Sequence, residues 1–249
     1  MCKTYCETLV VRGDACDASG RMRMDALFMA MQEGGTRHAE RLGASHAAML
    51  ERGLFFALMR VHVSVRRMPK AGETLIHTTW PGVSNRFFCP RYHIFALEDG
   101  TPVIEAGALW ALLDVQARRV VSPLKIDLGF PDNSDIPVPI NANPHMPAMG
   151  ENPASCLRTP VEAEFDINGH VNNTKYVAWL CDMIRDQFGT DVSISDLVVS
   201  YEKEIRSKDA FILSLSRNEA EFAFRVLSAE GSRHFSAGGT LLMREDDAL

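Results

Sequence analysis

The sequence predicts an α+β protein in which one unit, a long helix wrapped by an antiparallel β-sheet, occurs twice. Two observations predict this class: the order of the elements is the same in both halves, and a proline-rich stretch separates them. The chain has 249 residues, of which 46% are hydrophobic and 23% charged. It can therefore bury the core of one large domain or of two small ones. The net charge, 26 − 32 = −6, lacks the basic excess that nonspecific nucleic-acid binding requires.

The proline-rich stretch is the clearest boundary in the chain. Seven of the twelve prolines lie between Pro131 and Pro160, with Asn, Ser and Gly between them. Proline lacks a backbone donor and fixes φ, so this composition favours a connector over a helix or a central strand. We predict an N-terminal domain at 1–130, a linker at 131–153 and a C-terminal domain at 154–249.

The first half predicts a strand, a turn, a helix and then a sheet. A strand is expected at Glu7–Arg12 and a helix at about Met24–Leu42. The helix is apolar on most of its faces, so a sheet should wrap around it. Pro-Lys-Ala-Gly, Pro-Gly and Asp-Gly turn signals separate the four β-rich runs that follow, at Phe55–Arg67, Glu73–Trp80, Phe87–Leu97 and Val103–Val115.

The second half repeats this order. A short strand is expected before Asp166 and a helix at about Asn173–Phe188. Four strands should follow, at Leu197–Ile205, Phe211–Leu215, Glu221–Leu227 and His234–Met243. A shift of 149 residues aligns Asp17-Ala-Ser-Gly-Arg-Met with Asp166-Ile-Asn-Gly-His-Val without a gap. We interpret this as an internal duplication, which depends more on the order of elements than on residue identities.

The segment Asp166 to Asn173 contains the residues most suited to chemistry. Asp166, Asn168 and His170 alternate, so an extended segment would direct all three to one side. A carboxylate can orient an imidazole, an amide can polarise a carbonyl, and an imidazole titrates near neutral pH. The alternative interpretation is a plain turn followed by an Asn172 or Asn173 helix cap. The aligned first copy has Ser and Arg in place of Asn168 and His170, so only the second half is equipped for catalysis.

Asn168-Gly-His170-Val-Asn-Asn, followed by Tyr176 and Trp179, resembles the signature of the acyl-ACP thioesterases. The resemblance extends over nearly the whole chain. It implies two tandem hotdog folds, each a long helix wrapped by an antiparallel sheet, and hydrolysis of fatty acyl thioesters on acyl carrier protein without a cofactor. It also implies an acyl-chain pocket, for which the first half offers Leu27, Met31, Leu54, Phe55, Phe56, Met59 and Trp110, although each of these is equally explained as core. First-half segments that also resemble family positions include Gly20-Arg21, Glu33 to Gly43, Gly72-Glu73, Thr79-Trp80-Pro81, Arg86 and Trp110 to Asp114.

The resemblance implies a catalytic set of Asp166, Asn168, His170 and Glu204. Plant members often have Cys after the glutamate, whereas this chain has Ile205, so we favour water attack assisted by Glu204 and His170. In this scheme Asn168 and a backbone N–H at a helix N-terminus stabilise the oxyanion, and Asp166 orients its neighbours. Cys181, the cysteine nearest in sequence, is expected to be a small buried hydrophobe. From the local sequence alone, Glu204 reads as a solvated strand charge.

The implied partner is an acidic carrier protein that bears a phosphopantetheine-linked acyl chain. Three basic clusters could receive it, and we favour Lys203, Arg206 and Lys208 because this cluster adjoins Glu204. The alternative is a solvated strand end. Three other functions remain open: an acyl-CoA thioesterase, a hotdog hydratase, whose histidine spacing differs, and a non-catalytic acyl-binding module.

The remaining sequence features concern location and assembly. The six cysteines have no C-x-x-C spacing, which predicts free thiols in a reducing compartment and no zinc site. No signal-like or membrane-spanning apolar run is present, so we expect a cytoplasmic protein that binds neither metal nor membrane. The duplication allows a monomer to be complete, and a homodimer remains open.

Overall fold

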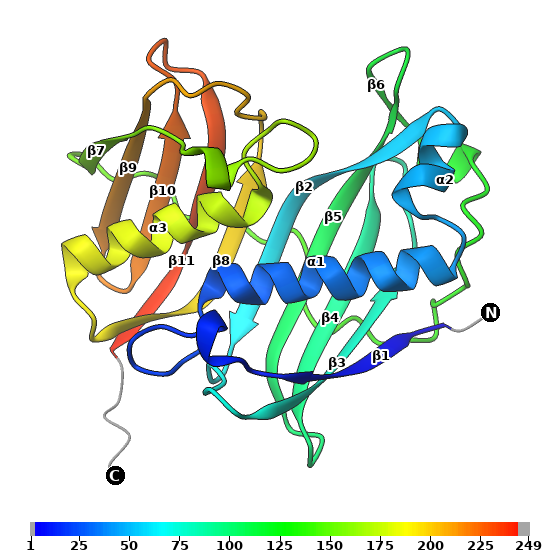
Figure 1. The fold of residues 1–249 in the computed structure, drawn as a ribbon, viewed down its shortest axis with the longest axis horizontal. Coiled ribbons are helices and arrows are strands. Elements are labelled where there is room, and N and C mark those ends of the chain that lie inside the picture. Colours follow the sequence, from blue (N-terminus) through cyan, green and yellow to red (C-terminus); the bar gives the residue numbers. More distant parts are fainter. Residues whose placement is uncertain (1–2, 244–249) are drawn as a thin grey trace. The chain divides into compact units, whose positions relative to one another are not determined.

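The computed structural model describes residues 3–243 and divides the chain into two compact units, unit 1 at 1–143 and unit 2 at 144–249. Each unit consists of one long helix that lies across an antiparallel sheet (Figure 1). The α+β class and the repeated order of elements agree with the prediction.

Unit 1 contains six strands and two α-helices within the described residues. The strands are β1 (Tyr5–Val10), β2 (Leu54–Val65), β3 (Thr74–Pro81), β4 (Cys89–Leu97), β5 (Pro102–Asp114) and β6 (Arg119–Val121). Their order in the sheet is β1-β3-β4-β5-β2, and β6 pairs with β5. The helices are α1 (Met24–Arg41) and α2 (His46–Glu51), and short 3-10 turns lie at Gly13–Ala15 and Pro123–Lys125.

Unit 2 contains five strands and one α-helix within the described residues. The strands are β7 (Ala154–Arg158), β8 (Val192–Tyr201), β9 (Phe211–Asn218), β10 (Glu221–Leu227) and β11 (Arg233–Met243), in the order β8-β11-β10-β9-β7. A 3-10 turn at Glu162–Glu164 precedes helix α3 (Asn173–Phe188). The Asn172 side chain caps α3 by accepting the Thr174 N–H at 3.0 Å, and Gly189 ends the helix with a φ of +83°. Both ends of α3 therefore follow from local sequence.

Most predicted elements are present, with ends displaced by a few residues. The expected strand Leu197–Ile205 is wrong at both ends, because β8 spans Val192–Tyr201. After Tyr201 the N–H groups of Glu202 and Lys203 both bond to the His234 carbonyl, at 2.9 and 3.1 Å, so the regular ladder stops. Glu204 consequently lies in a loop and not on a strand. Helix α2 and strand β6 are short elements that the sequence analysis did not identify.

The predicted linker at 131–153 is packed on both units and is not a free connector. In unit 1, Ala142 is buried against Trp80, Tyr92 and Leu109 on the sheet. In unit 2, Gly150 donates its N–H to Ser216 Oγ at 2.9 Å. The chain leaves unit 1 at Asn143 and enters unit 2 at Pro144, inside this segment.

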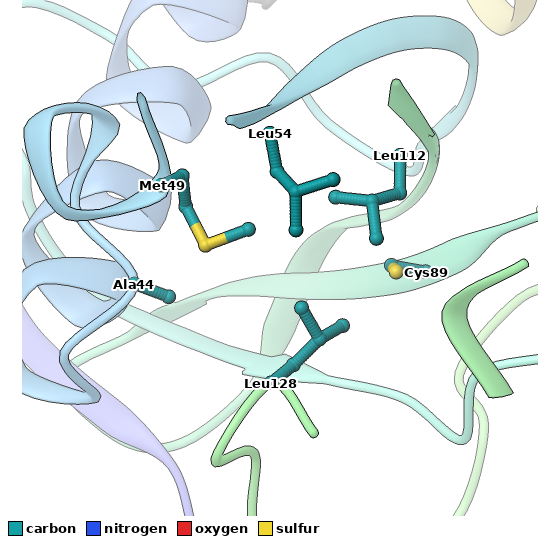
Figure 2. Packing of buried hydrophobic residues seen from close by; sticks show 6 residues of the cluster. All are labelled: Ala44, Met49, Leu54, Cys89, Leu112 and Leu128. Carbon is teal, nitrogen blue, oxygen red and sulfur yellow. The ribbon is translucent and has the colours of Figure 1, made fainter. Parts of the chain in front are cut away.

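Unit 1 has an apolar cluster beside α2. Figure 2 shows Met49 directed toward Leu54 and Leu112, with Cys89 and Leu128 on the far side. Phe56 and Trp110 pack on the edge of this cluster. Helix α2 has only six residues, too few for its own hydrogen bonds to keep it folded. The burial of these apolar side chains therefore stabilises it.

The space beneath the second half of α1 is polar, although the sequence predicts a helix that is apolar on most of its faces. Arg91 lies there among His38, His77 and His93, and the three histidine residues are at most 2% exposed. Gly34 and Gly35 face this layer. A Cβ on Gly34 would lie 2.7 Å from His77 Nδ1, and one on Gly35 would lie 3.2 Å from Arg91 Cδ. Glycine lowers the stability of a helix, but at these two positions a larger residue would collide with the polar layer beneath α1.

Hydrogen bonds define the protonation states in this polar layer. Glu7 Oε1 lies 3.0 Å from His77 Nδ1, and His77 Nε2 lies 3.0 Å from His93 Nδ1. A neutral His77 that donates to Glu7 can accept from His93, so both rings are satisfied without a positive charge. Burial lowers the pKa of both, although Glu7 opposes the effect at His77, and burial also lowers the pKa of Arg91 to about 10.

These lowered pKa values predict that unit 1 loses stability as the pH falls. Unfolded histidine titrates at about 6.5, so below that pH the unfolded chain binds protons that the folded His77 and His93 refuse. We expect the unfolding midpoint in urea to fall between about pH 7 and pH 5. A His93→Gln variant should lose less over this interval, whereas the exposed His46→Gln should follow wild type. Parallel pH profiles for wild type and His93→Gln would contradict this assignment.

Candidate functional site

The predicted catalytic segment forms a tight turn before α3. The Asp166 N–H donates to the His170 carbonyl at 2.9 Å, the Gly169 N–H donates to the Asp166 carbonyl at 3.0 Å, and Asp166 Oδ1 accepts the Asn168 N–H at 2.8 Å. Gly169 has a φ of +72°, which a side chain would strain. The expected extended segment is therefore wrong, because the Asp and Asn side chains favour a turn closed by their own backbone.

Unit 1 contains the same turn, bond for bond. The Asp17 N–H donates to the Arg21 carbonyl at 2.8 Å, and Asp17 Oδ1 accepts the Ser19 N–H at 2.9 Å. Gly20 has a φ of +74°. Because the two turns match while their side chains differ, the turn is a scaffold of the fold. The turn interpretation is correct for the backbone and leaves His170 unexplained.

His170 lies between two carboxylates. Its Nδ1 is 3.4 Å from Asp166 Oδ2, across the turn, and its Nε2 is 3.8 Å from Glu204 Oε1. The His170 and Asp166 side chains are 16% and 19% exposed, whereas Glu204 is 51% exposed. The turn thus presents one partly buried imidazole, with a carboxylate facing each ring nitrogen.

The loop that carries Glu204 is tied to the turn through its neighbour Ile205. The Val171 N–H donates to the Ile205 carbonyl at 2.9 Å, and the Ile205 N–H donates to the Tyr176 hydroxyl at 3.2 Å. Ile205 is 1% exposed. These contacts explain how a residue 34 positions after His170 comes to lie beside it, since 204 − 170 = 34.

The other predicted site residues occupy different surroundings. Asn168 is exposed at the tip of the turn. Arg206 donates from Nε to Glu204 Oε2 at 2.9 Å, and Lys208 forms an ion pair with Glu162. Lys203 is exposed, and its carbonyl lies 3.1 Å from His234 Nδ1. The structure therefore brings Asp166, His170 and Glu204 together, and two of the three predicted docking cations are engaged with carboxylates.

The sequence analysis missed a buried acid that supports the turn. Glu164 accepts a hydrogen bond from Trp179 Nε1 at 2.8 Å and from the Val161 N–H at 2.9 Å, and Arg158 pairs with it. Burial opposes ionisation, but these donors hold the pKa of Glu164 below its usual range. The Glu164 carbonyl accepts the Asn172 N–H at 2.9 Å. The spacing from Glu164 to Trp179 gave no local signal for this contact.

Two phenols beneath the turn stay neutral. Burial raises the pKa of Tyr176, whose ring packs on Phe235 with centroids 5.2 Å apart. Burial also raises the pKa of Tyr201, whose hydroxyl donates to the Asn173 carbonyl at 3.1 Å.

Among residues 3–243, no group of three metal-ligating side chains is close enough to hold an ion. In the same residues, no helix is both long and apolar enough to cross a membrane.

Comparison with known proteins identifies the family and the fold. The family model of the acyl-ACP thioesterase N-terminal domain matches residues 2–125, and that of the C-terminal domain matches residues 158–237. A dodecanoyl-acyl-carrier-protein hydrolase of Umbellularia californica is 25% identical over 204 residues, which are 77% of this chain and 53% of that protein. An oleoyl-acyl carrier protein thioesterase of Arabidopsis thaliana is 23% identical over 231 residues, 83% and 62% of the two chains. The chain spans about half the length of the first of these relatives.

Solved structures share the whole fold. An acyl-ACP thioesterase from Bacteroides thetaiotaomicron superposes with a TM-score of 0.85 and 21% identity, over 96% of this chain and 98% of that one. The 12:0-ACP thioesterase from Umbellularia californica gives 0.84 and 22%, over 98% and 99%. Fold and site therefore define a tandem-hotdog protein with a histidine–carboxylate site in its second unit. Within that class, the chain belongs to the acyl-ACP thioesterase family.

The Tyr176 hydroxyl is expected to be essential for holding the Glu204 loop. A Tyr176→Phe variant keeps the ring packing but leaves the buried Ile205 N–H without its acceptor, which costs roughly 1 to 3 kcal/mol. We expect a lower unfolding midpoint in urea and faster hydrogen exchange at the Ile205 amide. An unchanged exchange rate at Ile205 would show that the hydroxyl does not hold this loop.

Proposed function

We propose that this protein hydrolyses the thioester of fatty acyl-acyl carrier protein and releases free fatty acid. The observation that carries the proposal is the position of His170 between Asp166 and Glu204. Membership of the thioesterase family supports the substrate class, and the names of the relatives support a carrier-protein thioester. The roles of the individual residues and the choice of carrier are argued from the geometry of the site.

The spacing around His170 favours a water nucleophile. Nδ1 faces the Asp166 carboxylate and the Val171 carbonyl, both acceptors, so the ring proton belongs on Nδ1 and the Nε2 lone pair faces Glu204. The 3.8 Å between His170 Nε2 and Glu204 Oε1 is too long for a direct hydrogen bond and suits a bridging water. Such a water donates one hydrogen bond to each acceptor, which leaves a lone pair available to attack the thioester carbonyl. One of the two acceptors takes a proton from the water as the new C–O bond forms and delivers it to the sulfur as the C–S bond breaks, so the products are the carboxylic acid and the thiol.

The oxyanion that develops on the thioester requires nearby donors. Asn168 lies exposed at the turn, where its side-chain amide is available to a bound substrate. At the start of α3, the N–H groups of Thr174 and Lys175 bond to Asn172, so we assign the helix-terminal role to the Asn173 N–H. A helix N-terminus favours negative charge. Together these groups support the oxyanion role that the sequence predicts.

Unit 1 lacks this chemistry at the corresponding positions. Its turn has Arg21 where unit 2 has His170. The Met22 N–H donates to the Pro69 carbonyl at 2.8 Å, as the Val171 N–H does to Ile205, which makes Met68 the counterpart of Glu204. An arginine and a methionine cannot activate water, so we propose that unit 1 is catalytically degenerate.

A cysteine nucleophile is not favoured. Ile205 occupies the position after Glu204, and its side chain is buried. Cys181 is half-buried on α3, eight residues after Asn173, which corresponds to about 12 Å along the helix axis. We therefore keep the general-base scheme. The prediction that Cys181 is a buried hydrophobe is wrong in its burial, because the residue is only half-buried.

Removal of the Glu204 carboxylate tests the reaction. We expect Glu204→Gln to lower kcat on acyl-ACP by about 100-fold or more, because the amide cannot accept the proton of the water. Glu202→Gln is the matched control two residues earlier, and Cys181→Ala should retain activity. Thiol release from acyl-ACP and acyl-CoA panels measures both the reaction and the carrier. Full activity of Glu204→Gln, or abolished activity of a folded Cys181→Ala, would exclude this scheme.

The carrier preference separates this proposal from its main alternative. A strong preference for acyl-ACP supports the carrier protein, whereas turnover of acyl-CoA alone would make the protein an acyl-CoA thioesterase. Binding of an acyl chain without turnover of either substrate would indicate a non-catalytic acyl-binding module.

The docking surface for the acidic carrier can be tested without disturbing Glu204. Of the predicted cluster of Lys203, Arg206 and Lys208, we propose Lys203 and Lys208 as the docking cations, because Arg206 is bonded to Glu204. The double change Lys203→Glu with Lys208→Glu leaves that Arg206 contact intact. We expect a severalfold rise in KM for acyl-ACP with kcat unchanged, since reversed charges weaken encounter with an acidic partner. Hydrolysis of acyl-CoA serves as the control. An unchanged KM for acyl-ACP would remove this cluster from the docking surface.

We further propose a cytoplasmic location. No disulfide joins the five cysteines that lie within residues 3–243, which suits a reducing compartment.

A further inference from the structure

We propose that Arg206 is a positioning residue that sets the orientation of the Glu204 carboxylate, and that its main role is therefore in catalysis and not in docking. This inference rests on the proposed function, because it concerns the same carboxylate.

The backbone on both sides of Glu204 is held firmly. On one side, the Glu202 and Lys203 N–H groups donate to the His234 carbonyl. On the other side, Ile205 is buried and bonded through both its N–H and its carbonyl. The Cα of Glu204 is therefore fixed relative to the turn that carries His170.

The side chain of Glu204 has no such enclosure. It is 51% exposed, and a glutamate has three rotatable bonds that water alone would leave free. Arg206 removes this freedom, because its Nε and Nη2 both donate to Oε2, at 2.9 and 2.5 Å. Oε1 then faces His170 Nε2. The guanidinium thus engages one oxygen of the carboxylate and directs the other to the imidazole.

The positive charge of Arg206 is therefore paired with the Glu204 carboxylate inside the site. A guanidinium that is bonded to a carboxylate offers less attraction to an acidic partner than an unpaired one. The corresponding position in unit 1 carries Lys70, and the counterpart of Glu204 is Met68, whose side chain has no carboxylate. The arginine therefore accompanies the glutamate in the unit that has the histidine.

An exposed pair of this kind adds little to stability, so its loss should change catalysis and leave the fold intact. We expect Arg206→Gln to lower kcat on acyl-ACP and acyl-CoA alike by about tenfold, with KM for acyl-ACP unchanged. Arg206→Lys should recover part of the loss. Millimolar guanidinium should partly restore Arg206→Ala but not the double variant with Glu204→Gln. Arg12→Gln is the matched control, because Arg12 forms an exposed pair with Asp14, also a carboxylate two positions away, in unit 1.

A second measurement does not require turnover. The ¹⁵N resonances of the His170 imidazole should shift in Arg206→Gln and stay in place in Arg12→Gln. A rise in KM for acyl-ACP at constant kcat would assign Arg206 to docking and overturn the proposal. An unchanged His170 signal in Arg206→Gln would also overturn the proposal, whether or not the protein is active. Failure of the wild type to hydrolyse either substrate would refute the proposed function, and the His170 signal would still test the role of Arg206.

Discussion

The site depends on one backbone hydrogen bond, from the Val171 N–H to the Ile205 carbonyl. It joins the turn before α3 to the loop after β8, and both catalytic candidates sit next to its ends. His170 precedes the donor, and Glu204 precedes the acceptor. Because the bond involves main-chain groups only, it fixes the backbone positions of these two residues relative to each other without restricting which side chains they carry.

The duplicated unit shows what this freedom permits. Unit 1 has the same bond, from the Met22 N–H to Pro69, and the same turn closed by Asp17. Its side chains differ at the positions that correspond to His170 and Glu204, which carry Arg21 and Met68. One scaffold thus supports two different surfaces, and the chemistry follows from a few substitutions on a shared backbone.

Buried polar groups are handled differently in the two units. Beneath α1, Glu7, His77 and His93 form a hydrogen-bonded chain that needs Gly34 for space. In unit 2, Glu164 satisfies its charge with Trp179, Arg158 and a backbone donor. Both arrangements follow the rule that a buried polar group requires partners. We expect the first to make the protein sensitive to acid, and the second lies at the entrance to α3, where the Glu164 carbonyl accepts the Asn172 N–H.

Local sequence was sufficient to place most of the elements and to identify the motif that carries the family resemblance. Apolar periodicity, the Asn172 cap and Gly189 define α3 locally, so its predicted range, Asn173–Phe188, agrees with the structure. The motif around His170 carries the family resemblance for the same reason, since its residues are neighbours in the chain. Asp166 and His170 were expected to meet, although through an extended segment and not through a turn.

Groups that are distant in the sequence meet through the packing of each unit. From the local sequence, Glu204 is a solvated charge and Arg206 a docking cation. In the structure, burial of Ile205 beneath the turn brings Glu204 beside His170, and Arg206 contacts Glu204. The polar layer beneath α1 is equally invisible to periodicity, because it depends on which strands face Gly34 and Gly35. Contacts between residues far apart in sequence arise from packing of the whole unit, which no local pattern encodes.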